Sequence, residues 1–221
     1  MALRSKRQPI DERLLDTAID HFGRYGLNGA STRAIASAAG TMMSSITYHF
    51  GGKQGLYLAA ARHIAERITE RMGSALASSE AAMADQAGRD EAIAAMLAIV
   101  ERFAEIMVHP ESEPWARFIV REQMDPSEAF DVLFETFGPV AGRVAAHIVQ
   151  ISEGRVSPSD ARLRVIAIVG QVLAYRTARA ALLRLMDWDE VDAQGVAAIK
   201  CVVREHTLAI VTSGLGEEID E

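Results

Sequence analysis

The chain has 221 residues, of which 49% are hydrophobic and 24% charged, and its formal net charge at pH 7 is −7. This composition is typical of a globular protein with a sizeable buried core, and the negative balance argues against a protein that coats nucleic acid over its whole surface. The single cysteine, Cys201, excludes an internal disulfide, and its apolar helical surroundings predict a buried structural thiol.

The start of the chain and its apolar runs bear on the compartment. MALRSKRQPIDE is basic but is not followed by the apolar segment of a secretory signal. The longest uninterrupted apolar run, Ala92 to Val100, is much shorter than the roughly 20 residues that cross a bilayer. We therefore expect a cytoplasmic protein without a membrane partner.

Helical periodicity dominates the chain, and no Val-, Ile- and Thr-rich alternating run with turn dipeptides indicates a strand, so we expect an all-α fold. About nine helices are predicted, near residues 11–25, 32–39, 44–50, 53–84, 91–108, 113–124, 127–151, 158–186 and 193–213. Gly26, Gly40 and Gly51–Gly52 end the first three. Gly138–Pro139 is expected to bend the seventh, and ADQAGRD, residues 84–90, is expected to be a linker.

Charge is unevenly distributed along these elements. Residues 1–72 hold ten Lys and Arg against six Asp and Glu, whereas the remaining 149 residues hold thirteen against twenty-four. A basic N-terminal end on an acidic body indicates that only this end meets a polyanion, although chance clustering of charge gives the same pattern.

The third predicted helix is polar on one side. On a wheel with about 100° per residue, Ile46 and Phe50 fall together, so we expect them to face a core with the first helix. The other side carries Ser44, Ser45, Thr47 and Tyr48, with His49 at the border. Small side chains let a helix approach another surface closely, and hydroxyls can bond to bases and phosphate oxygens.

A tight connection, GTMM, joins the second and third predicted helices. Two short helices with such a join are the helix-turn-helix arrangement, whose second helix enters the major groove of DNA. Gly51–Gly52 leaves the next helix with free backbone N–H groups beside the Lys53 ammonium, which together make a phosphate site. Thr32 and Arg33 give a matching site at the start of the second helix.

Other interpretations of these residues remain open. Phe50 and Tyr57 are expected to be core residues, and His49 is either a border histidine or a contact. Ser45 and His49 stand at i, i+4, but no nearby acidic residue would orient the imidazole for catalysis. An all-helical enzyme is disfavoured because H-E-x-x-H, a Cys/His cluster and a phosphate loop are missing. A helical small-molecule carrier without a DNA function would not need the basic, glycine-punctuated start.

The stretch RLLDTAIDHFGRYGLNGASTRAIASAAGTMMSSITYHFGGKQGLY resembles the N-terminal DNA-binding domain of TetR-type transcriptional regulators. The motifs are an A…F…G first helix, a G…ST…IA…AG second helix, and YHF followed by K…L. The resemblance implies a three-helix helix-turn-helix domain, residues 1–55, linked by a helix from about residue 53 to a larger helical effector-binding and dimerisation domain, residues 56–221. FIVREQMDPSEAF and VVREHTLAI are similar to a CecR-type branch.

Function and site residues follow from this resemblance as expectations. It implies a bacterial, ligand-responsive repressor rather than an enzyme, with no cofactor or metal, that releases a palindromic operator when a small molecule binds. Thr32 and Arg33 would touch phosphate or groove edges, Ser44, Ser45 and Thr47 would lie in the major groove, and Tyr48, His49 and Lys53 would hold the DNA backbone. TMM at 41–43 departs from the family's usual aliphatic residue followed by polar or small ones. Met42 or Met43 would therefore contact a thymine methyl or only pack.

Aromatic side chains concentrate in the predicted helices 113–124 and 127–151. With Arg117, Arg121 and Glu122 among them, and Tyr175–Arg176 in a later apolar helix, they form either a small-molecule pocket or plain core packing. The predicted ligand-binding residues are Trp115, Phe118, Arg121, Phe134 and Tyr175. Broad apolar faces on the helices 158–186 and 193–213 predict a four-helix interface in a homodimer.

Overall fold

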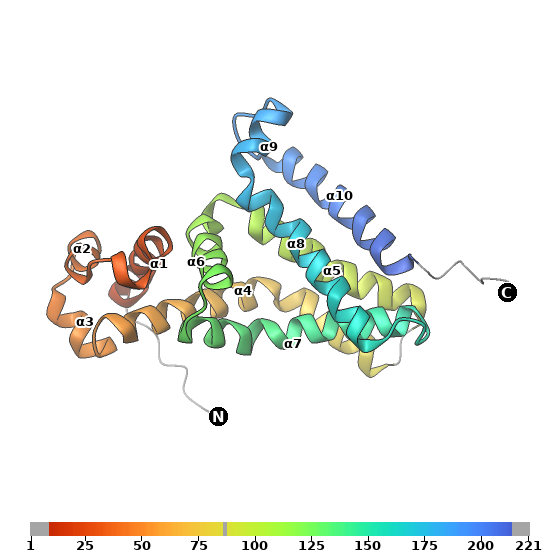
Figure 1. Cartoon of the computed structure of the whole chain (residues 1–221), viewed down its shortest axis with the longest axis horizontal. Helices are drawn as coiled ribbons and strands as arrows, with labels where there is room; N and C mark the ends of the chain where they lie inside the picture. Colours follow the sequence, from red (N-terminus) through yellow and green to blue (C-terminus); the bar gives the residue numbers. More distant parts are fainter. Residues whose placement is uncertain (1–8, 86–87, 214–221) are drawn as a thin grey trace. The chain divides into compact units, whose positions relative to one another are not determined.

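The computed structural model describes residues 9–85 and 88–213, and within these ranges it contains helices and no strand, which confirms the all-α expectation (Figure 1). The helices are α1 (Pro9–Gly29), α2 (Thr32–Ala38), α3 (Met43–Phe50), α4 (Lys53–Ala84), α5 (Arg89–Val108), the 3-10 turn η1 (Pro110–Ser112), α6 (Glu113–Met124), α7 (Glu128–Ile151), α8 (Pro158–Thr177), α9 (Arg179–Met186) and α10 (Ala193–Thr212). The basic segment MALRSKRQ and positions 86–87 of the expected linker lie outside the described residues.

The chain divides into two compact units. Unit 1 comprises Met1–Arg67 and Pro114–Thr136, and unit 2 comprises Ile68–Glu113 and Phe137–Glu221. Both α4 and α7 therefore contribute residues to each unit, and α6 belongs with the N-terminal helices. The expected domain boundary at residue 55 concerns the DNA-binding module and stays a prediction.

Unit 1 has an aromatic core. The periodic face of α1 is buried, as predicted, and comprises Leu14, Leu15, Ala18, Ile19 and Phe22. The ring of Tyr57 from α4 meets Phe22 edge-on at 4.8 Å between centroids and lies 4.7 Å from Phe118 of α6. The Tyr57 hydroxyl donates a hydrogen bond of 2.5 Å to the buried carboxyl of Glu122. The expectation that Tyr57 is a core residue is therefore confirmed, while Phe50 is half-buried.

The corner between α3 and α4 is sharp because of its glycines. Gly51 has φ 72° and accepts the left-handed conformation at the end of α3, and Gly52 follows with φ 114°. In the first turn of α4, a Cβ added to Gly55 would stand 1.7 Å from the carbonyl oxygen of Phe50. Only a residue without a side chain lets the two helices approach this closely.

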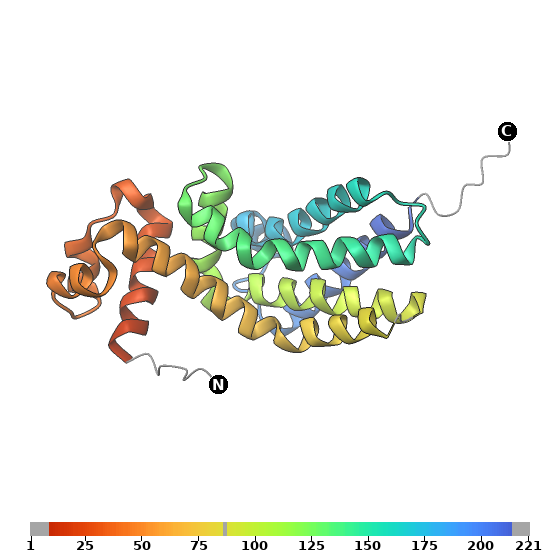
Figure 2. The ribbon, with the colours of Figure 1, turned by 90° about the horizontal axis from the view of Figure 1, so that it is seen from below.

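Unit 2 is built on three helices that pack on one another, α5, α8 and α10. Their buried side chains include Met96, Leu97 and Val100 of α5, Val165, Ile168 and Val172 of α8, and Ile199, Val203 and Val211 of α10. The second half of α4 runs beside α5 (Figure 2), where Arg102 donates to the carbonyl of Arg71 at 2.7 Å. The same part of α4 is tied to α7, because Ser79 and the buried ring of His147 form a 2.8 Å hydrogen bond.

The expected single helix over residues 158–186 is wrong. It is two helices, α8 and α9, bent by 73° at Ala178. The hydroxyl of Thr177 donates back to the carbonyl of Leu173, a bond of a kind that bends helices. Arg176, one residue earlier, is anchored to another element, since it donates to the carbonyls of Met107 and His109 at the end of α5. The Met107 carbonyl lies in the last turn of α5, where carbonyls have no partner within the helix, so the buried guanidinium helps to close the end of α5.

The expectation that Cys201 is a buried structural thiol is wrong. Cys201 is exposed, because it lies on the side of α10 away from the buried stripe of Ile199 and Val203. Its thiol donates to Glu205, and this hydrogen bond and the carboxylate charge raise the pKa of the thiol.

α7 reaches a mean hydropathy of 1.2 over 18 residues, enough by length and composition for a membrane span, although the longest uninterrupted apolar run of the chain is short. One such helix is weak evidence for a span, because core helices of soluble proteins pass the same test. In α7 28% of that window is buried, and the buried residues of the helix include Val144, Ile148 and Ile151.

Candidate nucleic-acid interface

The exposed face of α3 is arranged as the helical wheel predicts. Ile46 is 1% exposed and anchors the helix in the core of unit 1, whereas Tyr48 is 84% exposed. Ser44, Thr47 and His49 are also exposed, and Ser45 is half-buried. The hydroxyl of Thr41 donates to Ser45 at 3.3 Å, so the preceding turn helps to orient this side chain. α3 therefore presents hydroxyls and a tyrosine to the surroundings.

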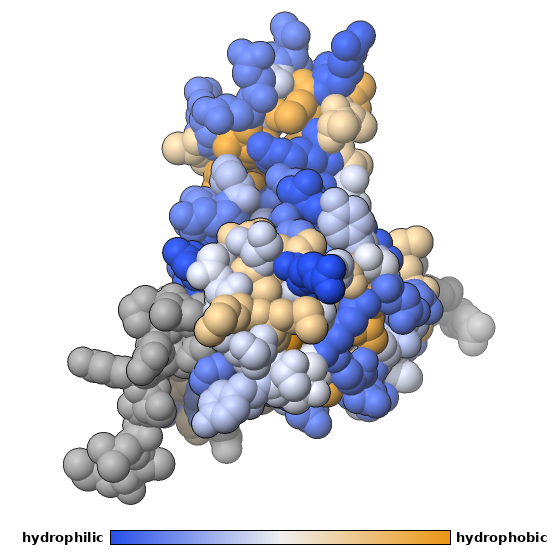
Figure 3. Space-filling view, turned by 90° about the vertical axis from the view of Figure 1, so that its left-hand side faces the viewer, coloured by the Kyte–Doolittle hydropathy of each residue, from blue (hydrophilic) through white to orange (hydrophobic). Residues whose placement is uncertain are grey.

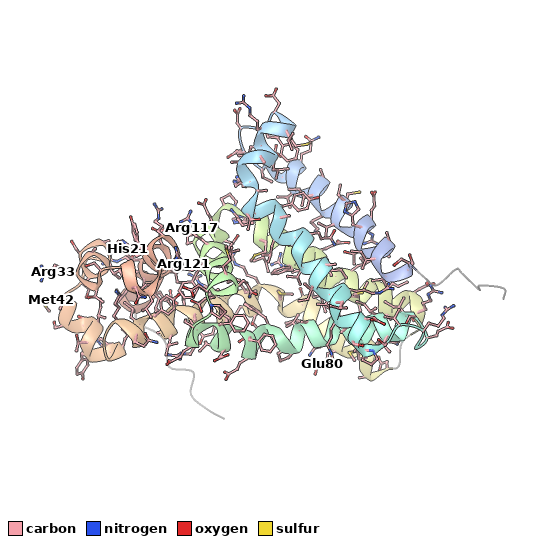
Figure 4. All side chains as sticks on the ribbon, viewed as in Figure 1. His21, Arg33, Met42, Glu80, Arg117 and Arg121 are labelled. Carbon is pink, nitrogen blue, oxygen red and sulfur yellow. The ribbon has the colours of Figure 1, made fainter. Side chains whose placement is uncertain are left out.

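α2 supplies an accessible cation at the same end of unit 1. Ser31 is the residue that caps this helix, since its side chain accepts from the backbone N–H of Ala34, and Thr32 is half-buried at the first helical position. Arg33 is exposed and makes no hydrogen bond or ion pair with any other residue that the structure describes. In Figure 4 it points outward from α2. Its guanidinium is thus available for an anion.

Lys53 is held in a defined position at the start of α4. Its ammonium donates a 3.0 Å hydrogen bond to the carbonyl of Asn28, which lies in the last turn of α1. An ammonium has three N–H donors, so this bond fixes the group and leaves donors for a phosphate. The first N–H groups of α4 lack partners within the helix, which adds to the attraction for an anion. Nothing in the sequence indicates the contribution of Asn28, because it stands 25 residues away.

Met42 and Met43 are the side chains whose role the sequence leaves open. Met42 is 73% exposed and Met43 is 49% exposed, so neither is a core residue of unit 1. Figure 4 labels both Met42 and Arg33 at the edge of the view where the N-terminal helices lie. Figure 3 shows this side of the molecule, where pale orange apolar areas are bordered by blue polar ones. Apolar and polar groups therefore share the exposed surface.

The Ser45–His49 pair has no catalytic geometry. Ser45 is bonded to Thr41, and the ring of His49 packs edge-on against Tyr48 at 4.9 Å between centroids. Among the described residues no hydrogen bond joins Ser45 to His49, and no carboxylate contacts the imidazole. The arrangement can donate and accept hydrogen bonds, but it has no activated nucleophile.

Four of the five predicted ligand-binding residues belong to unit 1. The guanidinium of Arg67 lies over the buried ring of Trp115, 5.8 Å from its centroid, and Phe118 is fully buried against Tyr57. Arg121 donates to the carbonyls of Gly23 and Arg24 in α1, and Figure 4 shows it reaching from α6 toward that helix. Phe134 is exposed and stacks on Phe130 at 5.8 Å. The fifth, Tyr175, lies in unit 2, where burial raises the pKa of its hydroxyl.

Unit 2 has a groove of about 730 Å³ between α5 and the first half of α10. None of the five predicted residues lines it. Two ion pairs join its walls, Arg204–Glu101 at 2.6 Å and Lys200–Glu105 at 3.9 Å. The charges of the groove are therefore largely neutralised within the protein.

The fold and the exposed α3 face define a helix-turn-helix DNA-binding protein. Two family models match the chain. The TetR family of bacterial regulatory proteins matches residues 14–60, and the C-terminal domain of the HTH-type transcriptional dual regulator CecR matches residues 92–214. The chain therefore belongs to the TetR family, in the branch that carries the CecR C-terminal domain, as the sequence motifs predict.

Individual proteins agree with this assignment. The dual regulator CecR of Shigella flexneri is 28% identical over 98% of this chain and 97% of its own length. The regulatory protein RaaS of Mycobacterium tuberculosis is 30% identical over 76% of this chain and 71% of its own length. AibR, solved in complex with isovaleryl coenzyme A and operator DNA, shares the fold with a TM-score of 0.65 at 14% identity, covering 89% of this chain and 97% of AibR. The protein is a DNA-binding transcriptional regulator and not an enzyme.

Proposed function

We propose that the protein is a homodimeric cytoplasmic repressor that releases a palindromic operator when a small molecule binds its C-terminal domain. The observation that carries the DNA-binding role is the exposed side of α3, opposite the buried Ile46. The proposed contacts are Thr32, Arg33, Ser44, Ser45, Thr47, Tyr48, His49 and Lys53. Phosphate contacts orient the protein on the duplex, and groups near α3 read base edges.

A dimer is supported by apolar side chains left uncovered in unit 2. Leu163 and Ile166 of α8 are 69% and 70% exposed, and Val202 of α10 is also exposed. Ala167, Gly170 and Ala174 continue the exposed side of α8 with small residues, which let a second pair of helices approach. α8 and α10 of two copies would then form a four-helix interface. A dimer on a two-fold axis presents its reading helices about 34–36 Å apart, one DNA turn.

A response to a small molecule is supported by AibR, which was solved with isovaleryl coenzyme A and operator DNA together. The ligand-binding role of Trp115, Phe118, Arg121, Phe134 and Tyr175 stays a prediction, and of these Phe134 retains the most open surface. A ligand that prefers the non-binding arrangement by about 1–3 kcal/mol is sufficient to shift DNA affinity appreciably.

The test is binding of the purified protein to the duplex upstream of its own coding region, measured by fluorescence anisotropy against an unrelated duplex. We expect selective binding that a compound screen can then reverse. Equal affinity for the two duplexes at low ionic strength would contradict operator recognition. A compound that binds the protein but does not release the DNA is not the effector.

A further inference from the structure

Two methionines occupy the leading end of the reading helix. Met42 is the residue before α3 and Met43 is its first residue. Both side chains are exposed, Met42 to 73% and Met43 to 49%, although methionine is a side chain that usually fills cores. The N-terminal residues of a recognition helix are the ones that reach base edges in the major groove. These side chains therefore stand where sequence is read.

The side chain of Met42 does not cap the helix that follows it. The position of Met42 is normally taken by Ser, Thr, Asp or Asn, whose oxygen accepts a hydrogen bond from the first turn. Met42 makes no such side-chain bond, so only its backbone carbonyl, which accepts from the N–H of Ser45, contributes a hydrogen bond to the start of α3. Because Met42 contributes neither a cap nor core packing, it is free to make an intermolecular contact.

The chemistry of the groove limits what a thioether chain can recognise. Methionine has no hydrogen-bond donor, and its sulfur is a weak acceptor. The apolar group that standard bases display in the major groove is the C5-methyl of thymine. Ser44 and Thr47, on the same exposed side of α3, supply the polar contacts. The leading end of α3 is therefore apolar, and the rest of its exposed side is polar.

We propose that Met42 and Met43 read thymine methyl groups in the operator and so determine part of its sequence. This inference rests on the proposed DNA-binding function and deepens it. Met42 and Met43 would contact the C5-methyl of one or two thymines in each half-site. Replacing thymine by deoxyuridine removes that methyl and leaves every hydrogen-bonding group of the base pair in place.

The experiment begins with duplexes selected from random DNA by the wild-type protein. Each thymine of one half-site is then replaced in turn by deoxyuridine, and the dissociation constant is measured. We expect about a fourfold loss at each contacted thymine, the equivalent of about 0.8 kcal/mol for one buried methyl-sized group. Met42→Ala or Met43→Ala should bind the thymine and deoxyuridine duplexes equally at that position.

A matched control and a folding control separate this role from general effects. Met124→Ala removes a methionine that is even more exposed, at the end of α6, and should keep the full sensitivity to deoxyuridine. Met42→Ser introduces a residue that caps helices well, so its melting temperature should equal or exceed that of the wild type. It should nevertheless lose the response to deoxyuridine.

The possible outcomes separate thymine recognition by Met42 and Met43 from operator binding itself. Selective DNA binding in which no deoxyuridine changes the wild-type affinity would overturn the inference and leave the proposed function standing. A sensitivity that persists unchanged in both methionine variants would also overturn it. A protein that selects no duplex at all would overturn the proposed function and this inference together.

Discussion

Arg33 and Lys53 are two cations close in sequence to the reading helix α3, and they differ in exposure and in hydrogen bonding. Arg33 is exposed and unbonded among the described residues, whereas Lys53 is half-buried and fixed by the carbonyl of Asn28. A free side chain loses more conformational entropy on binding than one already held in place. The contact from Lys53 is therefore the better preorganised of the two.

Arg33→Ala and Lys53→Ala should each weaken binding to all duplexes and reduce the slope of log K against log salt by about 0.9, the value for one phosphate contact. Lys53→Ala should cost the more affinity. Arg89→Ala, which removes an exposed cation from the start of α5, is the control and should leave the slope unchanged. An unaltered slope in either of the first two variants would reject the phosphate contact of that residue.

At the scale of elements, the α3–α4 corner depends on contact between backbones. Gly55→Ala places a methyl group 1.7 Å from the carbonyl oxygen of Phe50 and 2.9 Å from its carbonyl carbon, and these backbone atoms cannot move aside as a flexible side chain would. We expect a loss of about 1–3 kcal/mol in the free energy of unfolding, the usual range for overpacking, together with weaker DNA binding. Thermal melts and anisotropy titrations measure the two effects.

Gly73→Ala is the matched control for that prediction. Gly73 lies in the same helix, and nothing stands within 4 Å of an added Cβ. The alanine should therefore stabilise α4 by about 0.5–1 kcal/mol. If both variants changed stability in the same direction, the close approach at Gly55 would not be the cause.

The packing of α7 on α4 carries a pH dependence through His147. Burial lowers the pKa of this histidine, Arg143 acts in the same direction, and a hydrogen bond that the ring shares with Gln150 opposes both. The unfolded chain binds a proton near pH 6.5 while the folded chain resists it. The stability contributed by neutral His147 is therefore complete above that pH and is lost as the pH falls below it.

His147→Gln removes this titration and keeps a polar partner for Ser79. Between pH 7 and pH 5, urea unfolding should show a smaller loss of stability for the variant than for the wild type. His206→Gln, at an exposed position of α10, should match the wild type over the same range. If the free energy of unfolding fell equally with pH in the wild type and in His147→Gln, His147 would not be the source of the pH dependence.

For the whole molecule, the prediction concerns assembly. Ile166→Glu places a charge on the exposed apolar side of α8 and should convert the dimer into a monomer of 24.0 kDa by light scattering. Because two linked half-site contacts exceed one by about 10²–10⁴-fold in affinity, operator binding should fall strongly. Met124→Glu changes an even more accessible position, in unit 1, and should remain dimeric. A wild-type mass equal to one chain would contradict the dimer itself.

Much of unit 1 could be predicted from sequence, because its signals are local. Helical spacing placed Ile46 inward and Tyr48 outward on α3, and glycines marked the helix ends. The break at Ala178 could not be predicted, since the bond from Thr177 and the anchoring of Arg176 on α5 depend on tertiary packing. The same holds for Cys201, where apolar neighbours in sequence did not reveal which side of α10 packs inward.

The sequence by itself determined the all-helical fold, the helix-turn-helix and its family, because periodicity, glycine stops and short motifs act over a few residues. Only the tertiary structure decided which long-range partners hold the site: Asn28 for Lys53, Glu122 for Tyr57, and α1 carbonyls for Arg121. It also showed that Met42 and Met43 are uncovered. Such contacts join residues that are 25 to 98 positions apart in the sequence. They depend on how whole helices pack, so no local sequence pattern predicts them.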